Sequence, residues 1–570
     1  MITLGIESTA HTFGAGVVKD GEVLSNVRDM YIPEEGGIHP REAADHHVEK
    51  GAGVVRKALT EASVTEKDLD LVAFARGPGL GPCLRVGATI ARVISLKNGI
   101  PILGVNHCVA HLEIGSMLGC QDPVLLYTSG ANTQIIAYVR GRYRVLGETL
   151  DIGIGNMLDK LGREVGIPFP AGPGIEKLAR GESIPGVWEA DNGGAIPGII
   201  ELPYSVKGMD VSFSGLMTAA LNHYNRGVDL PIICRSVQET AFSMLCEVAE
   251  RAMAHIGSEE LLLGGGVACN GRLKEMAGIM VRERGGKSYA PPPSLAVDNG
   301  AMMAYLGEIM HRSGEKHQLT DTVIDQKFRT DMVDVRWKEM TELGSISTPG
   351  VVDPRIGGIP SEGDVIGRGA EAVTSYSSYH GLPSVLKKRI RKGYRIDEIE
   401  RPLVASRIRR EVRMLQAVRE TGIRTPYVLD LNETSSTITL EYLPGPRLAS
   451  ILNVSPEPFQ ISVIRNMGRI VGRMHSSNIV HGDLTTSNFI VLDDREDVDL
   501  GLIDCSLSEK TEEPEKMGVD LRLFFEVFAS THERLLSMED RFWEGYSSEN
   551  PNWREVRERL RSIEARGRYL

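Results

Sequence analysis

The sequence predicts two globular domains, a duplicated α/β core followed by a smaller α+β domain with two lobes. The chain has 570 residues, which is too long for a single hydrophobic core. One order of strand, polar turn, strand, tight turn and strand occurs twice between residues 1 and 149. A stretch rich in Gly, Pro and Ser at 341–361 then indicates a linker, and a new strand–glycine–strand pattern follows it.

The repeated unit of the first domain begins with an apolar strand that leads into a polar turn. In the first copy this strand lies at 2–9, and residues 14–27 form a predicted hairpin that bends at the Lys-Asp-Gly turn 19–21. The second copy occupies residues 123–149 and has the same plan. Each turn after a first strand presents backbone N–H groups that can hold a phosphate, so the repetition indicates a duplicated nucleotide-binding core.

Helices and further strands complete the first domain. A strand at 69–79 ends in glycines, and residues 81–99 have helical periodicity with a glycine just past the end. A strand at 101–106 precedes a helix that begins near His107. Residues 220–285 are predicted to be mainly helical around the apolar strand LLLGGGVA. Such a mixture of strands and helices is typical of an α/β domain.

Composition and charge exclude several classes of protein. The formal net charge is −12 and aromatic residues are only 5%, which argues against a general nucleic-acid binder and against a sheet that stacks bases. The seven cysteines are an odd number and no two have Cys-x-x-Cys spacing, so neither a disulfide framework nor a zinc–thiolate site is expected. Neither a signal peptide nor an apolar run of about 18 residues is evident, and we expect a cytoplasmic protein without membrane contact.

Two basic runs interrupt the acidic background. Residues 387–413 contain eleven Lys or Arg against four Asp or Glu, and residues 554–568 contain six Arg against three Glu. Charge runs usually form solvated helix faces, and that is one interpretation of both runs. The other interpretation is a basic surface that contacts a polyanion.

Two histidines four residues apart, His107 and His111, directly follow a strand. On a helix this spacing places both imidazoles on one face, as a single metal ion requires, and the alternative is two helix-start histidines with other partners. Tyr127 and Asp298 lie beside predicted turns and offer oxygen ligands. Such a mixed nitrogen and oxygen set suits iron or zinc better than calcium. Residue 108 is a cysteine, so the His-Glu-x-x-His pattern of zinc peptidases is absent and a metallopeptidase ranks low.

Glycines cluster in three places where a nucleotide would need a close approach of the backbone. These clusters are 77–79, 172–174 and 264–266. Asp159, Glu176 and Asn270 lie beside such segments and are candidates for contacts with ribose hydroxyls or a base edge. Each cluster alone is also typical of a turn, and each polar residue alone is also typical of a helix cap or a surface group.

Eight ordered motifs in residues 1–340 carry a specific resemblance. They are GIESTAHTFGAGV, GGIHPREAADHH, ARGPGLGPCLRVG, NHCVAHLE, YTSGANTQ, GPGIE, GGGVACNGRL and VDNGAM. On these motifs the first domain resembles the universal tRNA threonylcarbamoyl transferase family, the catalytic subunit of the KEOPS complex of archaea and eukaryotes. The resemblance implies an actin/sugar-kinase/Hsp70-like fold over residues 1–340.

The resemblance also implies roles for particular residues. His107, His111, Tyr127 and Asp298 match the metal ligands of the family, with Fe²⁺ as the expected metal and Zn²⁺ as the alternative. The adenylate-binding positions match Tyr127, Thr128, Ser129, Gly130, Ala131, Asp159, Gly172, Glu176 and Asn270. Ala131 is a departure, because many members carry glycine there, and its methyl group would crowd the phosphate only slightly.

The implied reaction transfers threonylcarbamoyl from threonylcarbamoyl-AMP to N6 of adenosine 37, immediately 3′ of the tRNA anticodon. The product, t6A, belongs to tRNAs that read codons beginning with adenine. Lewis-acid catalysis at the donor's oxygens is the chemistry that the metal supplies, and backbone N–H groups at the glycine turns hold the adenylate phosphate. The adenine amine is a poor nucleophile, so positioning contributes much of the rate. The donor is already activated, so no covalent Ser, Cys or Lys nucleophile is expected.

The second domain begins with a pattern that fits a phosphate-covering loop. Ile366, Gly367 and Gly369 are the predicted nucleotide contacts of this loop, although a single Gly-x-Gly is a weak signal. Lys387 follows on a strand, where a lysine would reach the phosphates of ATP, and its neighbour Lys388 is the alternative choice. Glu411 on a predicted helix is expected to pair with this lysine.

The strongest signal in the second domain is HGDLTTSN, in which Asp483 and Asn488 stand five residues apart. In kinases such an aspartate accepts the hydroxyl proton and such an asparagine binds a metal ion. Asp504 follows at the position of the second metal-binding aspartate, so we expect ATP with Mg²⁺ held by Asn488 and Asp504. The alternative is a set of coincidental acidic turns.

Residues 362–570 resemble the small atypical serine/threonine kinase of the same KEOPS complex, which many archaea carry fused to the transferase. The motifs are KGYR, the RRE helix, LEYLPG and HGDLTTSN. This resemblance implies ATP hydrolysis that supports turnover of the transferase, with some autophosphorylation. Cys505 and Ser506 stand where kinases carry Phe-Gly, and a long activation loop and an Ala-Pro-Glu element are missing before the helix near Val519. We expect altered switching, with metal binding retained at Asp504.

The two resemblances together imply tRNA, threonylcarbamoyl-AMP and ATP as ligands. They also imply two small partner subunits, a dimerising one on the first domain and another on the second, and the basic runs become candidate contacts to the tRNA backbone. Two rival functions stay open at this point. One is a kinase or ATPase whose first domain is a non-catalytic nucleotide-binding regulator, and the other is a scaffold in which both domains only bind nucleotide. A small-molecule kinase built on the first domain alone would leave His107 and His111 unexplained.

Overall fold

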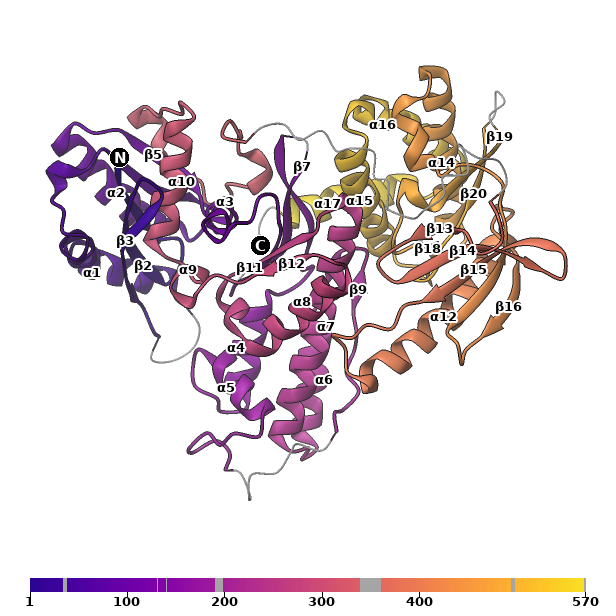
Figure 1. Ribbon diagram of the computed structural model, residues 1–570, viewed down its shortest axis with the longest axis horizontal. Helices are drawn as coiled ribbons and strands as arrows, with labels where there is room; N and C mark the ends of the chain where they lie inside the picture. Colours follow the sequence, from indigo (N-terminus) through magenta and orange to yellow (C-terminus); the bar gives the residue numbers. More distant parts are fainter. Residues whose placement is uncertain are drawn as a thin grey trace. The chain divides into compact units, whose positions relative to one another are not determined.

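A computed structural model of the chain divides into two compact units (Figure 1). The first comprises residues 1–205, 211–253 and 258–342, and the second comprises 206–210, 254–257 and 343–570. The structure describes residues 1–33, 38–130, 132–139, 141–189, 198–338, 360–493 and 498–567, with side chains up to residue 564. Most of the predicted linker lies outside the described residues, so the predicted domain boundaries at 340 and 362 stay predictions.

A five-stranded sheet forms the first half of the first unit. Its strands are β1 (Ile2–Glu7), β2 (Thr12–Lys19), β3 (Glu22–Met30), β4 (Leu71–Gly77) and β5 (Ile102–Asn106), in the order β3-β2-β1-β4-β5. The central strand β1 pairs antiparallel with β2 and parallel with β4. Five of the six β1 residues are buried, as expected for a strand covered on both faces.

A second sheet repeats this topology. Its strands are β6 (Val124–Thr128), β7 (Thr133–Val139), β8 (Arg142–Glu148), β11 (Glu260–Gly264) and β12 (Lys287–Tyr289), in the order β12-β11-β6-β7-β8. Strand β6 takes the place of β1, because it pairs antiparallel with β7 and parallel with β11. The prediction of a duplicated α/β core is therefore confirmed.

Helices occupy most of the intervals between these strands (Figure 1). They are α1 (Pro40–Glu61), α2 (Gly81–Asn98), α3 (His107–Glu113), α4 (Ile154–Glu164), α5 (Ala171–Ala179), α6 (Ser214–Asn225), α7 (Leu230–Ile256), α8 (Gly271–Glu283), α9 (Pro293–Ala296) and α10 (Gly300–Arg312). The short strands β9 (Val206–Lys207) and β10 (Asp210–Val211) pair with each other. The helix predicted at 81–99 matches α2, whose C-cap is Gly99 in the left-handed conformation.

Helix α10 lies directly on the backbone of the first sheet. A Cβ atom built on Gly300 would overlap the backbone of Ala15 and Gly16 on β2, and one built on Gly5 of β1 would overlap the backbone of α10. The helix begins after Asn299, whose side chain accepts a hydrogen bond from Met302 N at 3.0 Å. This close contact fixes the start of α10 beside β1 and β2.

The Gly300→Ala substitution should destabilise the first unit by roughly 1–3 kcal/mol, because the added methyl group forces α10 away from β2. Gly53→Ala is the matched control, since a Cβ there meets nothing within 4 Å on the exposed face of α1. Removing a helical glycine should stabilise the protein by about 0.5–1 kcal/mol. Chemical denaturation measures both effects, and equal stability of the two variants would contradict the close packing of α10.

The second unit opens with a five-stranded antiparallel sheet. Its strands are β13 (Val365–Arg368), β14 (Ala372–Tyr379), β15 (Leu382–Arg389), β16 (Val428–Asn432) and β17 (Thr437–Glu441), in the order β13-β14-β15-β17-β16. The long helix α12 (Asp397–Glu420) connects β15 to β16. This part forms the first lobe of the predicted α+β domain.

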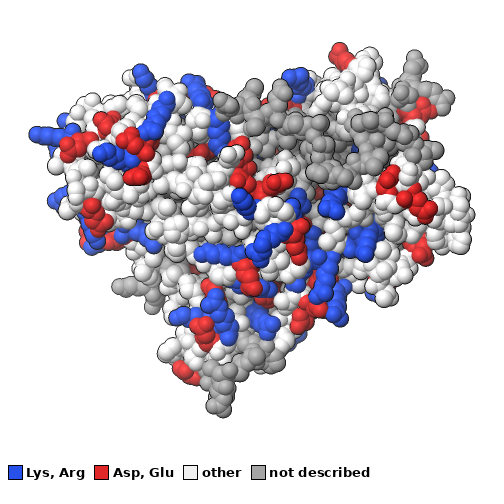
Figure 2. Space-filling view, viewed as in Figure 1, with Lys and Arg blue, Asp and Glu red and all other residues white. Residues whose placement is uncertain are grey.

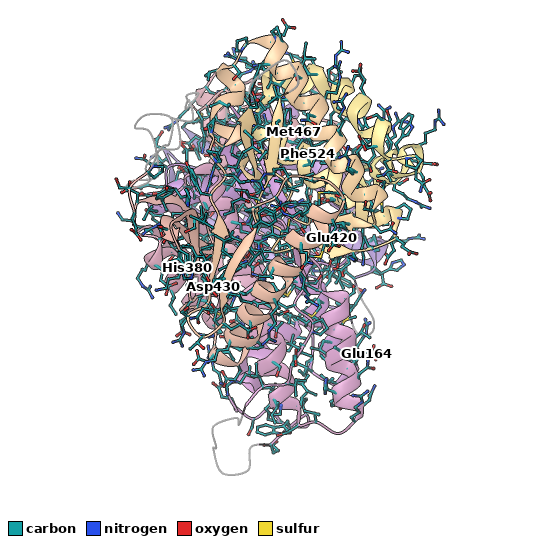
Figure 3. All side chains as sticks on the ribbon, turned by 90° about the vertical axis from the view of Figure 1, so that its right-hand side faces the viewer. Glu164, His380, Glu420, Asp430, Met467 and Phe524 are labelled. Atoms are coloured by element: carbon teal, nitrogen blue, oxygen red, sulfur yellow. The ribbon has the colours of Figure 1, made fainter. Side chains whose placement is uncertain are left out.

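Helices dominate the remainder of the second unit. The elements are α13 (Leu448–Ile451), α14 (Glu457–Ser476), β18 (Ile479–Val480), β19 (Phe489–Asp493), β20 (Asp499–Leu502), β21 (Glu509–Lys510), α15 (Pro514–Thr531), α16 (Glu539–Glu549) and α17 (Trp553–Gly567). Met467 of α14 and Phe524 of α15 are buried in the core that these helices share, and both are labelled in Figure 3. The two-lobed α+β prediction is confirmed.

No helix among the described residues is both long enough and apolar enough to cross a membrane. All seven cysteines carry free thiols, and six of them are buried. The absence of a disulfide framework agrees with the spacing of the cysteines in the sequence.

Candidate functional site

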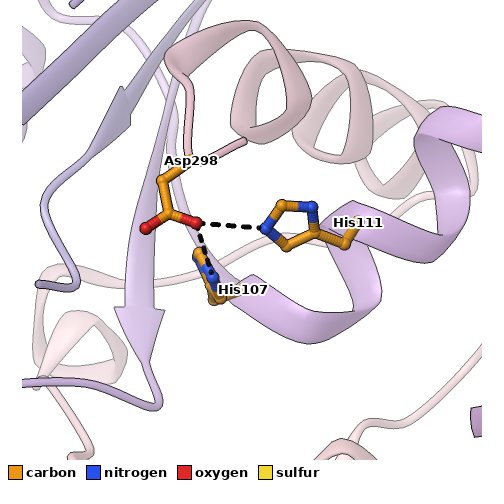
Figure 4. A group of neighbouring side chains, drawn as sticks. All are labelled: His107, His111 and Asp298. Atoms are coloured by element: carbon orange, nitrogen blue, oxygen red, sulfur yellow. Dashed lines mark hydrogen bonds and ion pairs between the residues drawn. The ribbon is translucent and has the colours of Figure 1, made fainter. Parts of the chain in front are cut away.

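Two histidines and an aspartate converge in the first unit (Figure 4). One carboxylate oxygen of Asp298, Oδ1, lies 3.5 Å from His107 Nε2 and 3.3 Å from His111 Nε2. The Tyr127 hydroxyl lies 3.0 Å from His107 Nε2. The His and Asp ligand atoms all lie within 4.8 Å of one another, and this donor set of imidazole nitrogen, carboxylate and phenol fits one metal ion.

Local structure explains why these side chains meet. The Asn106 side chain, at the end of β5, caps α3 by accepting a hydrogen bond from Val109 N at 3.1 Å. His107 is thus the first residue of the helix, and His111 follows one turn later on the same face. Tyr127 comes from β6 in the second sheet, and Asp298 precedes α10. The candidate metal ligands therefore come from both halves of the duplicated core.

Burial and charge set the protonation of this cluster. Burial lowers the pKa of His107, but the carboxylates of Glu7 and Asp298 outweigh burial and raise this pKa to about 9. Burial lowers the pKa of His111. Burial acts to raise the pKa of Asp298, yet the two imidazoles hold it below its usual range. Burial raises the pKa of the Tyr127 phenol well above its usual value.

Glu7 is a member of this cluster that sequence reasoning missed. Its Oε2 lies 3.0 Å from His107 Nδ1, and its side chain is completely buried at the end of β1. Its Oε1 accepts hydrogen bonds from the Thr9 backbone N at 2.7 Å and from the Thr9 hydroxyl. A carboxylate on Nδ1 leaves Nε2 facing Tyr127 and Asp298, as a histidine ligand requires. The available signal was an acidic residue that ends an otherwise apolar strand.

The predicted phosphate turn follows Tyr127. Ser129 N donates to Asn132 O at 2.9 Å, and Gly155 N at the start of α4 donates to Ser129 O at 3.1 Å. Thr128, the last residue of β6, is held by the neighbouring strand β11, because its hydroxyl donates to Gly264 O at 3.1 Å. Gly130 lies in the same turn, since its carbonyl accepts from Asn156 N at 2.9 Å, and Ala131 lies outside the described residues.

A Cβ on Gly265 would overlap the backbone of Thr128, and this glycine has φ +89°. The third predicted glycine cluster therefore permits β11 and the turn after β6 to approach closely. This contact brings one predicted adenylate-binding segment against another.

The remaining predicted adenylate residues form a second group on α4, α5 and α8. Asp159 accepts a hydrogen bond from Ala171 N at 2.8 Å, beside Gly172, where a Cβ would meet open space. Glu176 accepts from Gly271 N at 2.9 Å, and Asn270 caps α8 by accepting from Arg272 N at 2.8 Å. Asn270 is thus the N-cap of α8, which was the alternative interpretation from the sequence, whereas Asp159 lies within α4 and accepts from the first residue of α5.

His11 connects this second group with the metal cluster. Its imidazole interacts electrostatically with both Asp159 and Asp298, and its ring makes an edge contact with Phe169, with centroids 6.3 Å apart. The sequence offered no signal for this role, because the relevant partners are more than 140 residues away along the chain.

In the second unit, Lys387, Glu411 and Asp504 are brought together. Lys387 Nζ donates to Glu411 Oε1 at 2.6 Å and lies 2.9 Å from Asp504 Oδ1. Burial lowers the pKa of Lys387, but the two carboxylates outweigh it and raise this pKa. Lys388 points to the opposite face of β15 and is exposed, so the geometry favours Lys387 over this alternative.

The predicted catalytic loop adopts a tight arrangement. Asn488 Nδ2 donates to the carbonyl of Asp483 at 2.8 Å, and Ile503 N donates to Asn488 O at 2.8 Å, next to Asp504. Asp520 on α15, which sequence reasoning missed, accepts from His481 N at 2.7 Å and from Gly482 N at 2.8 Å. A fully buried carboxylate thereby anchors the loop just before Asp483.

The predicted phosphate-covering loop is a hairpin. Ile366 and Gly367 lie on β13, and Gly369 N donates to Ala372 O at 3.0 Å across the turn into β14. A Cβ on Gly367 would lie 2.6 Å from the Thr374 hydroxyl and close to the guanidinium of Arg447, so glycine lets these two side chains approach the hairpin. Residues Ile366, Gly367 and Gly369 are therefore placed on one hairpin.

Cys505, which stands where kinases carry phenylalanine, is completely buried in the core of the second unit. Burial raises the pKa of its thiol to about 12, so it is an inert apolar group. Asp504 has φ +61°, a left-handed conformation that aspartate tolerates. With cysteine in place of phenylalanine at position 505, the Asp504 carboxylate still pairs with Lys387.

Two family models match the chain. Residues 22–305 match the tRNA N6-adenosine threonylcarbamoyltransferase model, and residues 361–521 match the lipopolysaccharide kinase (Kdo/WaaP) family. Proteins from Methanocaldococcus jannaschii and Methanosarcina mazei, each named probable bifunctional tRNA threonylcarbamoyladenosine biosynthesis protein, are both 43% identical to this chain. The first match covers 100% of both chains and the second covers 99% of both.

Solved structures resemble the chain in part. WaaP in complex with acyl carrier protein has a TM-score of 0.27 and 16% identity, covering 36% of this chain and 87% of that chain. T. kodakarensis HypF has a TM-score of 0.40 and 14% identity, covering 56% of this chain and 48% of that chain.

The fold, the cluster of His107, His111 and Asp298 in the first unit, and the Lys387, Glu411 and Asp504 contacts in the second unit define the class of protein. It is a duplicated α/β transferase joined to an atypical kinase-like domain. The chain belongs to the family of bifunctional tRNA threonylcarbamoyladenosine biosynthesis proteins.

Metal affinity of the metal-free protein should rise about tenfold per pH unit between pH 7 and 9, because a proton on His107, whose pKa is about 9, competes with the metal. The same protonated His107 stabilises the metal-free fold fully below pH 6.5, and this contribution is lost as the pH rises through 9. Titration calorimetry with Zn²⁺ measures the affinity. Glu7→Gln should shift the pH range in which the metal affinity rises to lower pH. A metal affinity that does not change with pH in the wild type would contradict the protonation of His107.

Proposed function

We propose that the first unit transfers threonylcarbamoyl from threonylcarbamoyl-AMP to N6 of adenosine 37 in tRNAs that read codons beginning with adenine, and that the second unit is a kinase or ATPase that supports turnover. The observation that carries the first part is the convergence of His107, His111 and Asp298 beside the phosphate turn after β6. Family membership over the full chain length supports both parts.

His107, His111, Tyr127 and Asp298 would hold the metal, with Fe²⁺ preferred and Zn²⁺ as the alternative. When bound, it supplies Lewis-acid activation of the donor's oxygens. Asp298 is the most exposed of the three His and Asp ligands, at 19% against 5% and 1% for the histidines, so this side of the cluster faces the substrate.

The backbone of the turn 128–130 is proposed to hold the adenylate phosphate, and Asp159, Glu176 and Asn270 the nucleoside. Transfer forms a bond from adenine N6 to the carbamoyl carbon and breaks the bond from this carbon to the AMP oxygen. AMP leaves with the electron pair, and the amine loses one proton. The residues of the first unit mainly position the two substrates, since the donor is already activated.

In the second unit, Lys387 is proposed to bind ATP phosphates, and Asn488 and Asp504 to hold Mg²⁺. Asp483 accepts the proton of the attacking hydroxyl or water. Glu411 keeps Lys387 in place, and Ile366, Gly367 and Gly369 cover the nucleotide.

Cations without an ion pair occur in both basic runs. On α12, the exposed Arg401 and Arg409 pair with Asp397 and Glu433, and Figure 2 shows acidic side chains beside many of the basic ones on the face drawn. Arg413 on α12 and Arg559 and Arg561 on α17 make no ion pair with any residue that the structure describes. Unpaired cations are suited to phosphates, so both α12 and α17 are proposed contacts to the tRNA backbone.

The small dimerising partner is proposed to bind the first unit at α1 and α2. Val48 on α1 and Val93 and Leu96 on α2 expose 67%, 56% and 63% of their surface, which is an apolar surface suited to a subunit contact. A second small subunit binds the second unit, and the assembly acts in the cytoplasm.

The transferase proposal predicts that wild type, threonylcarbamoyl-AMP and unmodified tRNA yield t6A, detected by mass spectrometry after nuclease digestion, with the small subunits added where required. His111→Ala removes one metal ligand and should reduce product at least a hundredfold. His223→Ala on α6, outside the cluster, is the matched control. Equal product from His111→Ala would rule out the proposed metal site.

For the second unit, Lys387→Met should reduce the rate of ATP hydrolysis about a hundredfold, because the phosphates lose a positioned cation. Lys388→Met removes the same charge from the opposite, exposed face of β15 and should leave the rate unchanged. A phosphate-release assay measures both. The reverse order of effects would show that the neighbouring lysine is the nucleotide ligand.

A further inference from the structure

Glu411 holds two cations rather than one. Arg389 stands two residues after Lys387 on β15, so both side chains leave the same face of the strand. Lys387 Nζ lies 2.6 Å from Glu411 Oε1, and Arg389 Nη2 lies 2.7 Å from Glu411 Oε2. Each oxygen of this completely buried carboxylate therefore has its own cation.

The ionic contacts continue from Arg389 to the phosphate-covering loop. Glu371 lies between β13 and β14, two residues after Gly369, and one of its oxygens pairs with Arg389 Nη1. The other oxygen accepts from Arg407 Nη1 at 2.7 Å. Arg407 lies one turn before Glu411 on α12, so it projects from the same face of the helix. Loop, strand and helix are thus connected by side chains that are at most 16% exposed.

Positive and negative groups alternate along the whole series. The order is Arg407, Glu371, Arg389, Glu411, Lys387 and Asp504. Burial lowers the pKa of Arg389, but Glu411 and Glu371 outweigh it and raise this pKa, so Arg389 stays charged. Three cations balance three carboxylates, which offsets the cost of burying them.

Nucleotide binding would interrupt this series at one end only. Lys387 must turn from Asp504 to the phosphates, and Asp504 must turn to Mg²⁺. Glu411 then still has Arg389, and Glu371 still has Arg389 and Arg407. The position of α12 and of the loop therefore does not depend on the Lys387–Glu411 pair alone.

The segment that regulates this pair in other kinases is short here. In protein kinases, activation-loop phosphorylation and the position of the equivalent helix control the Lys–Glu pair. In this chain only residues 505–513 separate Asp504 from α15, and Cys505 is fixed in the core. The sequence had indicated altered switching, and the ionic series supplies a physical basis for it.

We propose that Arg389, Glu371 and Arg407 are positioning residues that hold α12 and the phosphate-covering loop permanently in the nucleotide-binding arrangement. The second unit therefore binds ATP without an activating modification. This inference rests on the proposed use of ATP by the second unit.

The test compares Glu371→Gln and Arg389→Met with wild type in the full-length protein. Both variants should raise the Kd and the KM for MgATP about tenfold, the loss expected for a charge-assisted hydrogen bond, while kcat changes by less than about twofold. Amides of residues 397–420 should exchange with deuterium faster in the nucleotide-free variants, and saturating MgATP should restore their protection. Glu433→Gln is the matched control, because it breaks the exposed pair with Arg409 on the same helix.

Unchanged Kd and unchanged exchange of α12 in both variants would overturn the inference, as would a fall in kcat at constant KM. Glu371→Gln is nearly isosteric, so this variant alone tests the inference if Arg389→Met does not fold. Failure of wild type to bind MgATP would instead remove the proposed function of the second unit. In that case the amide exchange rates of α12 in the nucleotide-free proteins still test whether the ionic series holds this helix in place.

Discussion

The close contact between α10 and the first sheet is the constraint on which the candidate metal site depends. Gly5 on β1 and Gly300 on α10 allow backbone to meet backbone, and this brings the loop before α10 to the carboxyl end of β1. Asp298 and Glu7 consequently flank His107 from opposite sides, Asp298 near Nε2 and Glu7 near Nδ1. A side chain at either glycine would separate the helix from the sheet and widen the cluster.

The buried charges are compensated differently in the two units. In the first unit two carboxylates, Glu7 and Asp298, lie beside His107, and one proton on this imidazole leaves the cluster with an excess of negative charge that a divalent metal ion would neutralise. In the second unit the cations and carboxylates alternate and are already balanced. The first arrangement is suited to binding a metal ion, and the second is suited to holding a helix and a loop in place.

Features that depend on local sequence were predictable, and features that depend on distant contacts were not. The helix at 81–99 and the shared face of His107 and His111 follow from spacing of a few residues. Tyr127 and Asp298 were candidate oxygen ligands because they lie beside predicted turns, but only the resemblance placed them in one site with the histidines, since no local rule brings residues 20 and 187 positions from a histidine together. Asn270 has the cap contact that the sequence left as an alternative.

The residues that were missed share one property. Glu7, Arg389 and Asp520 act through partners that are 100, 22 and 39 positions away along the chain. Lys338 and Glu113 are a similar pair, 3.2 Å apart, which ties the end of the first unit to the end of α3. Such pairs become visible only when the strands and helices are placed.

X-ray absorption spectroscopy of the metal-loaded protein identifies the atoms bound to the metal. We expect one metal ion per chain with imidazole scattering from two histidines and further oxygen ligands, at distances of about 2.0–2.2 Å for Zn²⁺. Loss of one imidazole in His111→Ala should accompany this signature. Sulfur scattering, or a first shell without imidazole, would contradict the assignment of His107, His111, Tyr127 and Asp298 as the metal centre.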